Sequence, residues 1–304
     1  MSPLDSASVV VAGGAVLGLS LATVYAIARR NRTTGLTSRT ALARAGSYVG
    51  LAVAVLIATR AGVPGLAVLF GALGALGLLE WARLFGLPVH HKVAIVFANV
   101  VITWAIAVDG VEAADWLVGG LVLLGVVWPV IRADTGRAIH DLGIAAVGVV
   151  FVTVLLVHGV ALGVERGEAG LALVLALAVA CAFSDVGAFM AGRTFGRTPL
   201  APHLSPNKTR EGVVGNLVGA AVGIAPFAPA IAPSFGVPFL LALAPIVAAG
   251  AVWGDLLESA AKREAGVKDT GQWLPGFGGI LDRIDSLLVT VAIAYWVARL
   301  WGTG

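Results

Sequence analysis

Ten apolar runs divide this sequence, and their lengths decide what the chain can fold into. Each run holds 16 to 23 residues, and a helix of roughly 20 residues crosses the ~30 Å hydrocarbon core of a bilayer. The composition agrees, because 59% of the residues are hydrophobic and only 12% are charged. We therefore predict an all-α polytopic integral membrane protein with nine or ten transmembrane helices, of which ten is favoured. The runs are residues 8–28, 43–59, 64–82, 93–108, 115–131, 142–162, 169–191, 212–232, 237–254 and 286–302.

The basic residues between these runs predict how the chain lies in the membrane. The segment before the first run has no basic residue, so we expect a retained helix rather than a cleaved signal peptide. Arginines follow that run, and basic residues recur in every second connection afterwards, which predicts an outside N-terminus. The loops 193–211 and 255–285 then face the cytoplasm, in an inner-membrane protein. A net charge of only +3, without a basic block, gives no support for a nucleic-acid partner.

The segment 255–285 concentrates the polar chemistry. It holds ten of the 37 Asp, Glu, Lys and Arg residues in 31 positions. If the preceding helix continues to Gly266, one of its faces carries four polar residues at spacings of three and four, namely Asp255, Glu258, Ser259 and Lys262. Asp282, Asp285 and Ser286 share a face of the last helix. The turn 275–279, Pro-Gly-Phe-Gly-Gly, would bring the two acidic faces together at the cytoplasmic edge of the membrane.

This combination predicts a metal-assisted phosphate site. Carboxylate oxygens suit Mg²⁺, which binds one or two carboxylates together with substrate phosphates. Zinc is disfavoured because the cluster has no His or Cys, and the single cysteine, Cys181, lies in an apolar run. The alternative is a salt-bridged loop without a site. Exposed ion pairs contribute little to stability, and that alternative leaves the glycine turn unexplained.

A second polar segment precedes the eighth apolar run. Asp185 lies inside the seventh run, where a carboxylate is costly unless it faces a polar cavity or has a partner. Ser205, Asn207 and Lys208 then come just before a helix expected to begin near Glu211. Such donors beside a helix N-terminus favour phosphate. The alternatives are a helix–helix hydrogen bond for Asp185 and ordinary juxtamembrane charge for the loop.

These segments resemble a known family. Residues 259–285 follow the pattern S-x-x-K-R-x(4)-K-D-x(4)-L-P-G-x-G-G-x-x-D-R-x-D, which is similar to the signature of phosphatidate cytidylyltransferases (CDP-diacylglycerol synthases). Residues 205–212 resemble that family's SPNKT-x-EG segment, and residues 185–193 its D-x-x-A-Y-x-x-G-R segment. The resemblance covers about residues 180–290. The N-terminal half resembles the family only in being hydrophobic.

The resemblance implies transfer of a cytidylyl group from CTP to phosphatidic acid, or a related lipid phosphate, in phospholipid biosynthesis. It implies Mg²⁺ as cofactor, with a second cation left open, and it makes a homodimer reasonable. Residues 1–168 would be a scaffold and residues 169–304 the catalytic region. By position, the catalytic candidates are Lys262, Arg263, Lys268, Asp269, Asp282 and Arg283. The substrate-binding candidates are Asp185, Ser205, Asn207, Lys208, Ser259, Gly276, Gly278 and Gly279. The metal-ligand candidates are Asp255, Asp269, Asp282 and Asp285.

Three positions depart from the family pattern. Phe277 replaces the His of PGHGG, Arg210 replaces an aromatic residue, and Phe189 replaces a Tyr. A Phe side chain cannot transfer a proton, so any role of that His is missing here. One alternative is therefore a homologue that binds lipid phosphate without catalysis or with another specificity. A transporter is less favoured, because the polar residues gather at one edge rather than near the midplane of paired halves.

Overall fold

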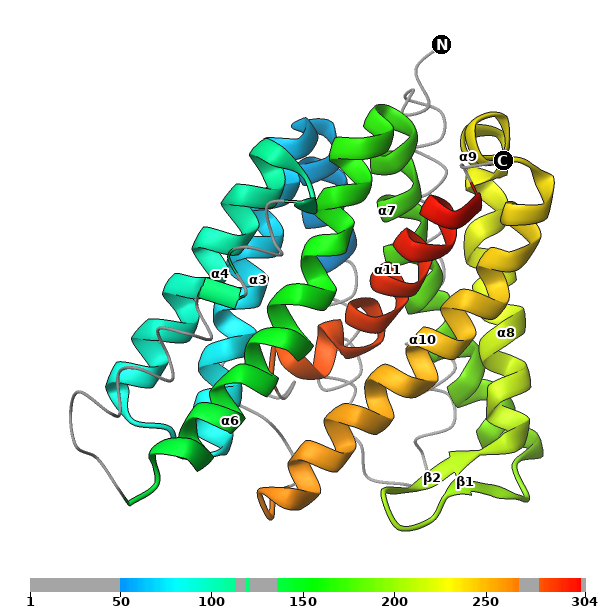
Figure 1. Ribbon diagram of the computed structural model, residues 1–304. Helices are drawn as coiled ribbons and strands as arrows, with labels where there is room; N and C mark the ends of the chain where they lie inside the picture. Colours follow the sequence, from blue (N-terminus) through cyan, green and yellow to red (C-terminus); the bar gives the residue numbers. More distant parts are fainter. Residues whose placement is uncertain (1–49, 113–116, 118, 121–135, 268–278, 302–304) are drawn as a thin grey trace.

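The fold is seen in a computed structural model that describes residues 50–112, 117, 119–120, 136–267 and 279–301. It is built almost wholly from helices, with one short β-hairpin at one end (Figure 1). A short apolar helix spans Gly50–Arg60. The other elements are, in chain order, α3 (Gly62–Leu84), α4 (Val89–Asp109), α6 (Ala138–Gly148), the π-helix η1 (Val149–Val154), α7 (Leu155–Phe195), β1 (Pro199–Ala201), β2 (Ser205–Thr209), α8 (Arg210–Ile224), the 3₁₀ helix η2 (Ala225–Phe227), α9 (Ala228–Phe235), α10 (Val237–Glu264) and α11 (Leu281–Trp301).

Six helical segments in the described ranges are long and apolar enough to cross a membrane. They are Gly62–Leu84, Val89–Asp109, Ala138–Phe195, Arg210–Phe235, Val237–Glu264 and Leu281–Trp301. These segments coincide with seven of the predicted apolar runs, because Ala138–Phe195 contains two of them. The runs 8–28 and most of 115–131 lie outside the described residues. The helical membrane fold is confirmed, whereas the count of ten spans stays a prediction.

The 58-residue segment Ala138–Phe195 reverses its direction at Gly167. A straight helix of that length would extend about 87 Å, far more than a bilayer core. Gly167 has φ 53° and ψ −133°, which lies outside the helical region. Both ends of the segment consequently lie at the same end of the molecule (Figure 1). The Arg166 guanidinium donates to the Ala298 carbonyl at 2.9 Å and ties this turn to α11.

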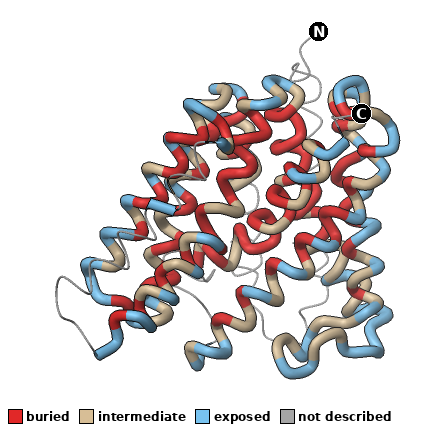
Figure 2. Tube along the Cα trace, viewed as in Figure 1, coloured by how far each residue is buried: buried red, intermediate tan, exposed pale blue. Residues whose placement is uncertain are grey.

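The centre of the bundle is formed by α7 and α11. In the most apolar stretches of Ala138–Phe195 and Leu281–Trp301, 61% of the residues are buried, against 28% in Gly62–Leu84. Figure 2 shows buried positions gathered toward the interior and exposed ones around the outside. Large apolar side chains that remain exposed, such as Val68 and Trp104, lie on the outer helices. Such surfaces suit contact with lipid in a protein of this composition.

The polar connections gather at one end of the bundle. The α3–α4 connection, the start of α6, the β-hairpin and the end of α10 all lie at the lower end of Figure 1. These connections carry part of the basic residues on which the predicted orientation rests, whereas the arginines that follow the first apolar run lie outside the described residues. The fold therefore agrees with the expected alternation of loops. Which side of the membrane this end faces stays a prediction.

Candidate active site

A polar cleft of about 690 Å³ lies at this end of the bundle. Its walls come from the end of α7, the hairpin strand β2, the start of α8, the last turns of α10 and the first turns of α11. Both polar segments identified in the sequence therefore meet in one site. The predicted residues that line the cleft are Asp185, Ser205, Asn207, Lys208, Asp255, Lys262, Asp282 and Asp285.

Three carboxylates form the acidic centre of the cleft. Oxygen atoms of Asp255, Glu258 and Asp285 lie within 4.8 Å of one another. Asp255 and Glu258 are one turn apart on α10, whereas Asp285 comes from α11. The two helices are in backbone contact here, since a Cβ atom at Gly254 would lie 2.1 Å from the Asp285 carbonyl oxygen. Glycine at position 254 therefore permits the close approach of α10 and α11 that brings Asp285 beside Asp255 and Glu258.

The donor set fits a hard divalent cation. All three groups offer carboxylate oxygens, the ligands that Mg²⁺ and Ca²⁺ prefer. Glu258 and Asp285 are buried. Glu258 Oε1 is a buried atom that has no hydrogen-bond partner among the described residues. Because an unpaired buried oxygen is costly, this atom is suited to accept a ligand from the cleft. The expectation of a cation site is supported, and the identity of the cation stays a prediction.

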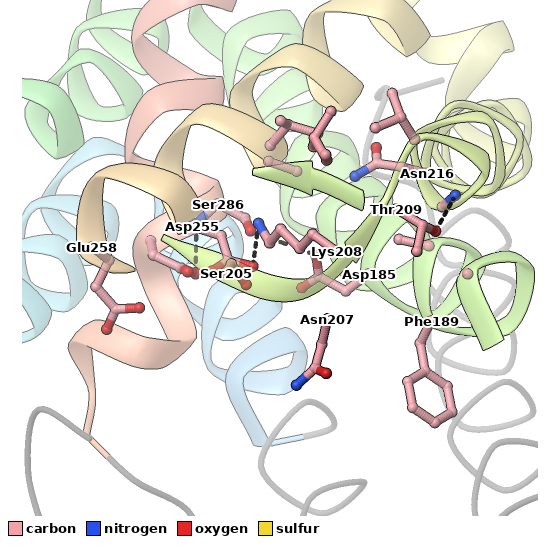
Figure 3. Close-up of a pocket in the computed structure, with 18 of the residues that line it drawn as sticks. Asp185, Phe189, Ser205, Asn207, Lys208, Thr209, Asn216, Asp255, Glu258 and Ser286 are labelled. Carbon is pink, nitrogen blue, oxygen red and sulfur yellow. Dashed lines mark hydrogen bonds and ion pairs between the residues drawn. The ribbon is translucent and has the colours of Figure 1, made fainter. Parts of the chain in front are cut away.

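Two lysines lie against these acids. Lys208 Nζ lies 2.5 Å from Asp255 Oδ2 and connects β2 to α10. Figure 3 shows Lys208 extending from the strand toward Asp255, close to Asp185. Lys262 Nζ lies 2.8 Å from Glu258 Oε2 and 2.7 Å from Asp282 Oδ1. The cleft thus holds both the cationic and the anionic groups that binding of a metal–phosphate complex requires.

Asp282 has a structural position distinct from the three carboxylates. Its Oδ2 accepts a hydrogen bond from the Gly279 backbone N–H at 2.7 Å, and its Oδ1 accepts one from Lys262. Gly279 lies two residues before α11, so this hydrogen bond joins the incoming chain to the first turn of the helix. Asp282 therefore connects the start of α11 to Lys262 on α10. Its predicted role as a metal ligand stays a prediction.

The wall of the cleft on α7 carries Asp185. Its Oδ1 accepts a hydrogen bond from the Ser286 hydroxyl at 3.5 Å. Further along this wall, the buried Ser184 hydroxyl donates to the Asn216 amide oxygen from α8. Asn216 lines the cleft. In Figure 3, Asn207 and Phe189 point away from the carboxylate cluster.

Several predicted residues lie beside the cleft rather than in its wall. The Ser259 hydroxyl donates to Asp255 Oδ1 at 3.3 Å, and Arg263 Nε donates to the Leu204 carbonyl at 3.4 Å. Ser259 therefore supports a cleft residue, and Arg263 reaches the β-hairpin. Gly279 contacts Asp282, and Arg283 does not line the cleft. The remaining predicted residues, Lys268, Asp269, Gly276 and Gly278, lie outside the described residues, as does Phe277.

The site candidates drawn from the sequence did not include five polar residues that line the cleft, namely Arg193, Thr209, Asn216, Glu258 and Ser286. Glu258 was recognised on the polar face of α10 but not as a metal-ligand candidate. Ser286 follows Asp285 and shares the α11 face. Asn216 lies seven residues beyond the SPNKT segment, two turns into α8. Glu258 and Ser286 had been placed on the polar faces of their helices, and including every polar residue of those faces would have made them site candidates. The contribution of Asn216 depends on α8 packing against α7.

Comparison with known proteins decides the family. The sequence profile of the cytidylyltransferase family matches residues 42–301. The chain belongs to this family. The phosphatidate cytidylyltransferase of Pseudomonas aeruginosa is 34% identical over 251 residues, which cover 78% of this chain and 88% of that protein. The family assignment made from the three motif segments is thus confirmed, and with it the enzyme class of nucleotidyltransferase.

Other relatives in the family differ in how much of their length is matched. The phosphatidate cytidylyltransferase of Mycobacterium bovis is 32% identical over 219 residues, or 66% of this chain and 67% of that protein. The chloroplastic phosphatidate cytidylyltransferase 5 of Arabidopsis thaliana is 44% identical over 119 residues. Those residues are 39% of this chain and only 30% of the plant protein.

Proposed function

We propose that this chain transfers the cytidylyl group of CTP to phosphatidic acid and forms CDP-diacylglycerol and pyrophosphate. The observation that carries the proposal is the cleft in which Asp255, Glu258 and Asp285 meet beside Lys208 and Lys262. The site belongs to a helical membrane protein of the cytidylyltransferase family. The printed names of the relatives support phosphatidate as the lipid substrate.

The reaction needs alignment more than acid–base chemistry. A phosphate oxygen of the lipid attacks the α-phosphorus of CTP and forms the new P–O bond. The bond from that phosphorus to the α,β-bridging oxygen breaks, and pyrophosphate leaves with the electron pair. The attacking oxygen is already anionic, so no base has to remove a proton. Positioning and charge neutralisation supply the rate enhancement, and both are functions that the lysines and carboxylates of the cleft are suited to perform.

Within this proposal each charged group has a defined task. Asp255, Glu258 and Asp285 would hold Mg²⁺, which supplies positive charge to the triphosphate when bound. Lys208 pairs with Asp255, and its ammonium group would contact the phosphates beside a cation that Asp255 binds. Lys262 is held between Glu258 and Asp282, and its charge reduces the repulsion between these two acids.

The surroundings of the cleft fit a lipid substrate. Its wall includes apolar side chains such as Val213 and Val252 beside the charged ones. Phe189, at the rim, is about half exposed. We infer that the acyl chains lie against the apolar surface of the bundle while the phosphate enters the cleft. The chain length and linkage of the lipid are left open by these contacts.

We also propose the arrangement in the membrane on the grounds of charge. The polar end of the bundle would face the cytoplasm, where CTP is available, in an inner membrane that the chain spans about ten times. The N-terminus would lie outside. Residues 1–168 would form the scaffold and residues 169–304 the catalytic region, with a homodimer as the proposed assembly. The basic connections at one end of the bundle support this orientation.

The test is the incorporation of label from [α-³²P]CTP into lipid by the purified protein with phosphatidic acid. We expect label in the lipid fraction with Mg²⁺ and none with EDTA. Asp285→Asn should lower the rate at least about 100-fold, because it removes a charged oxygen from the centre of the cleft. Asp109→Asn, an equal change at an exposed carboxylate at the end of α4, is the matched control and should leave the rate unchanged. Equal rates in the two variants would contradict the proposed site.

The second candidate function is lipid-phosphate binding without catalysis, which Phe277 favours because the family pattern has His there. An inactive wild type that becomes active on Phe277→His would identify a disabled transferase. If both proteins bind phosphatidic acid in vesicles and neither forms CDP-lipid, the binding function replaces the transferase.

A further inference from the structure

Glu80 is a buried carboxylate in a helix that carries none of the sequence motifs. It lies in the last turns of α3 and has no exposed surface. Its Oε1 accepts a hydrogen bond from the Ile280 N–H at 2.8 Å, and its Oε2 accepts one from the Leu281 N–H, also at 2.8 Å. Both oxygens of a side chain in the predicted scaffold thus contact the segment that opens α11.

These contacts cap α11 from a distant part of the chain. The first N–H groups of a helix have no partner within the helix and are usually capped by a neighbouring side chain. Here the cap comes from 200 positions away in the sequence. A charged acceptor is stronger than a neutral one and interacts favourably with the positive end of the helix dipole. Glu80 is therefore suited to fix where α11 begins.

The position of α11 decides the geometry of the cleft. Asp282 follows Leu281 directly, and Asp285 lies one turn further on the same helix. On its other side α11 contacts α10 at Gly254, opposite Asp285. The start of α11 is thus held between Glu80 on α3 and the glycine contact on α10. A shift at Leu281 would carry Asp285 away from Asp255 and Glu258.

We propose that Glu80 is a positioning residue that sets the α11 carboxylates against those of α10. The inference rests on the proposed function, and it adds to the machinery of that site a residue that lies outside the three motif segments. Glu80 touches neither the cleft nor a reacting group, so it acts through Asp282 and Asp285. Replacing it should disturb the metal-binding geometry more than the fold.

A matched control comes from the opposite end of α11. There Glu165 accepts a hydrogen bond from the Tyr295 hydroxyl at 2.5 Å and lies 3.9 Å from Arg299. Glu165 also holds α11 by a tertiary contact, but far from the cleft. Glu80→Gln and Glu165→Gln make the same chemical change at the two ends of one helix. A difference between them separates positioning of the site from general support of α11.

The experiment measures three properties of purified wild type, Glu80→Gln and Glu165→Gln. These are the melting temperature, the Mg²⁺ concentration at the midpoint of Mg²⁺-induced thermal stabilisation, and kcat and KM for CTP. We expect both variants to melt below the wild type. Only Glu80→Gln should raise the Mg²⁺ midpoint, by about tenfold, and lower kcat, by about 100-fold. Its KM for CTP should change by less than about threefold, because Lys208 stays in place.

Failure of the Glu80 inference can be distinguished from failure of the proposed function. If the wild type forms no CDP-lipid, the proposed function fails, while the Mg²⁺ midpoints still decide the role of Glu80. The inference is overturned if Glu80→Gln leaves the Mg²⁺ midpoint unchanged. It is also overturned if Glu165→Gln shifts the midpoint equally, or if the wild type shows no stabilisation by Mg²⁺. Glu80→Asp, which keeps the charge but shortens the reach, should recover part of kcat and thereby support the capping contact.

Discussion

At the scale of single residues, Glu258 illustrates how burial creates a binding function. One of its oxygens pairs with Lys262, and the other, Oε1, is buried without a hydrogen-bond partner in the described part of the chain. Leaving a buried polar atom unsatisfied costs about 1–3 kcal/mol. A cation bound between Glu258, Asp255 and Asp285 would remove that cost, so this residue is expected to contribute to metal affinity.

We predict that Glu258→Gln raises the Mg²⁺ concentration needed for half-maximal activity by at least about tenfold. Replacing a residue that only hydrogen-bonds to a metal ligand lowers metal affinity roughly 10- to 100-fold. Glu258 is proposed to bind the cation directly, so its replacement should have at least the smaller of these effects. Activity against Mg²⁺ concentration is the measurement. Glu264→Gln, at an exposed carboxylate on the same helix, is the control. A Mg²⁺ requirement shared by wild type and both variants would remove Glu258 from the site.

The sequence predicted the neighbours of some site residues and not of others. The sequence places Asp255 and Lys262 seven residues apart, and helical geometry alone puts them on one face. The pairing of Lys208 with Asp255 could have been predicted, because the two polar segments were expected to contribute to one phosphate site. Glu80 was not predictable. Its partners are 200 positions away, and no periodicity or motif in α3 signals a contact that arises only when α3 packs beside α11.

At the scale of elements, the contact between α10 and α11 controls the distance between the acidic faces. A Cβ atom at Gly254 would lie 2.1 Å from the Asp285 carbonyl oxygen, so any larger residue must push the helices apart. We predict that Gly254→Ala destabilises the protein by about 1–3 kcal/mol and lowers CDP-lipid formation at least about tenfold. Thermal unfolding and the labelled-CTP assay would measure the two effects.

Gly143 provides the comparison for this prediction. It is exposed in α6, and a Cβ atom there would meet no atom within 4 Å. Gly143→Ala should leave activity unchanged and add about 0.5–1 kcal/mol of stability, because alanine loses less backbone entropy in a helix. If the two substitutions had equal effects, the close approach of α10 and α11 would not govern the site.

The boundaries of the elements were predictable where Pro and Gly mark them. The helix expected near Glu211 begins at Arg210, and the helix expected to stop at Gly266 ends at Glu264. The π-helix Val149–Val154 was not predictable. It lies in an apolar run, and the ring of its Phe151 is 5.9 Å from the Trp81 ring of α3. Such irregularities depend on a neighbouring helix rather than on the local sequence.

At the scale of the whole molecule, hydropathy predicts spans better than it predicts architecture. A segment that crosses the membrane forms a helix because unpaired backbone groups are costly in lipid. Each such helix needs a long apolar run, so each span can be predicted from its own part of the sequence. Their arrangement is set by side-chain packing between segments far apart in the chain. The central position of α11 depends on the reversal at Gly167 and on the contacts of Arg166 with its C-terminal end. The reversal was predicted, because the apolar runs 142–162 and 169–191 are separated by the charged connection 163–168. The contact of Arg166 with α11 has no signature in composition or periodicity.

The predicted orientation in the membrane can be measured directly. Cys181 is the single cysteine and is buried, so Cys181→Ala gives a background without thiols. In that background His203→Cys places a thiol in the exposed β-hairpin loop, and Glu168→Cys places one at the exposed turn beside Gly167.

With the cleft facing the cytoplasm, a membrane-impermeant maleimide should label Glu168→Cys in intact spheroplasts and His203→Cys only after lysis. The reverse pattern would place the CTP-binding end outside and contradict the positive-inside argument. The two thiols lie at opposite ends of the part of α7 that follows Gly167, one at the turn and the other in the β-hairpin loop. Each variant therefore serves as the other's control.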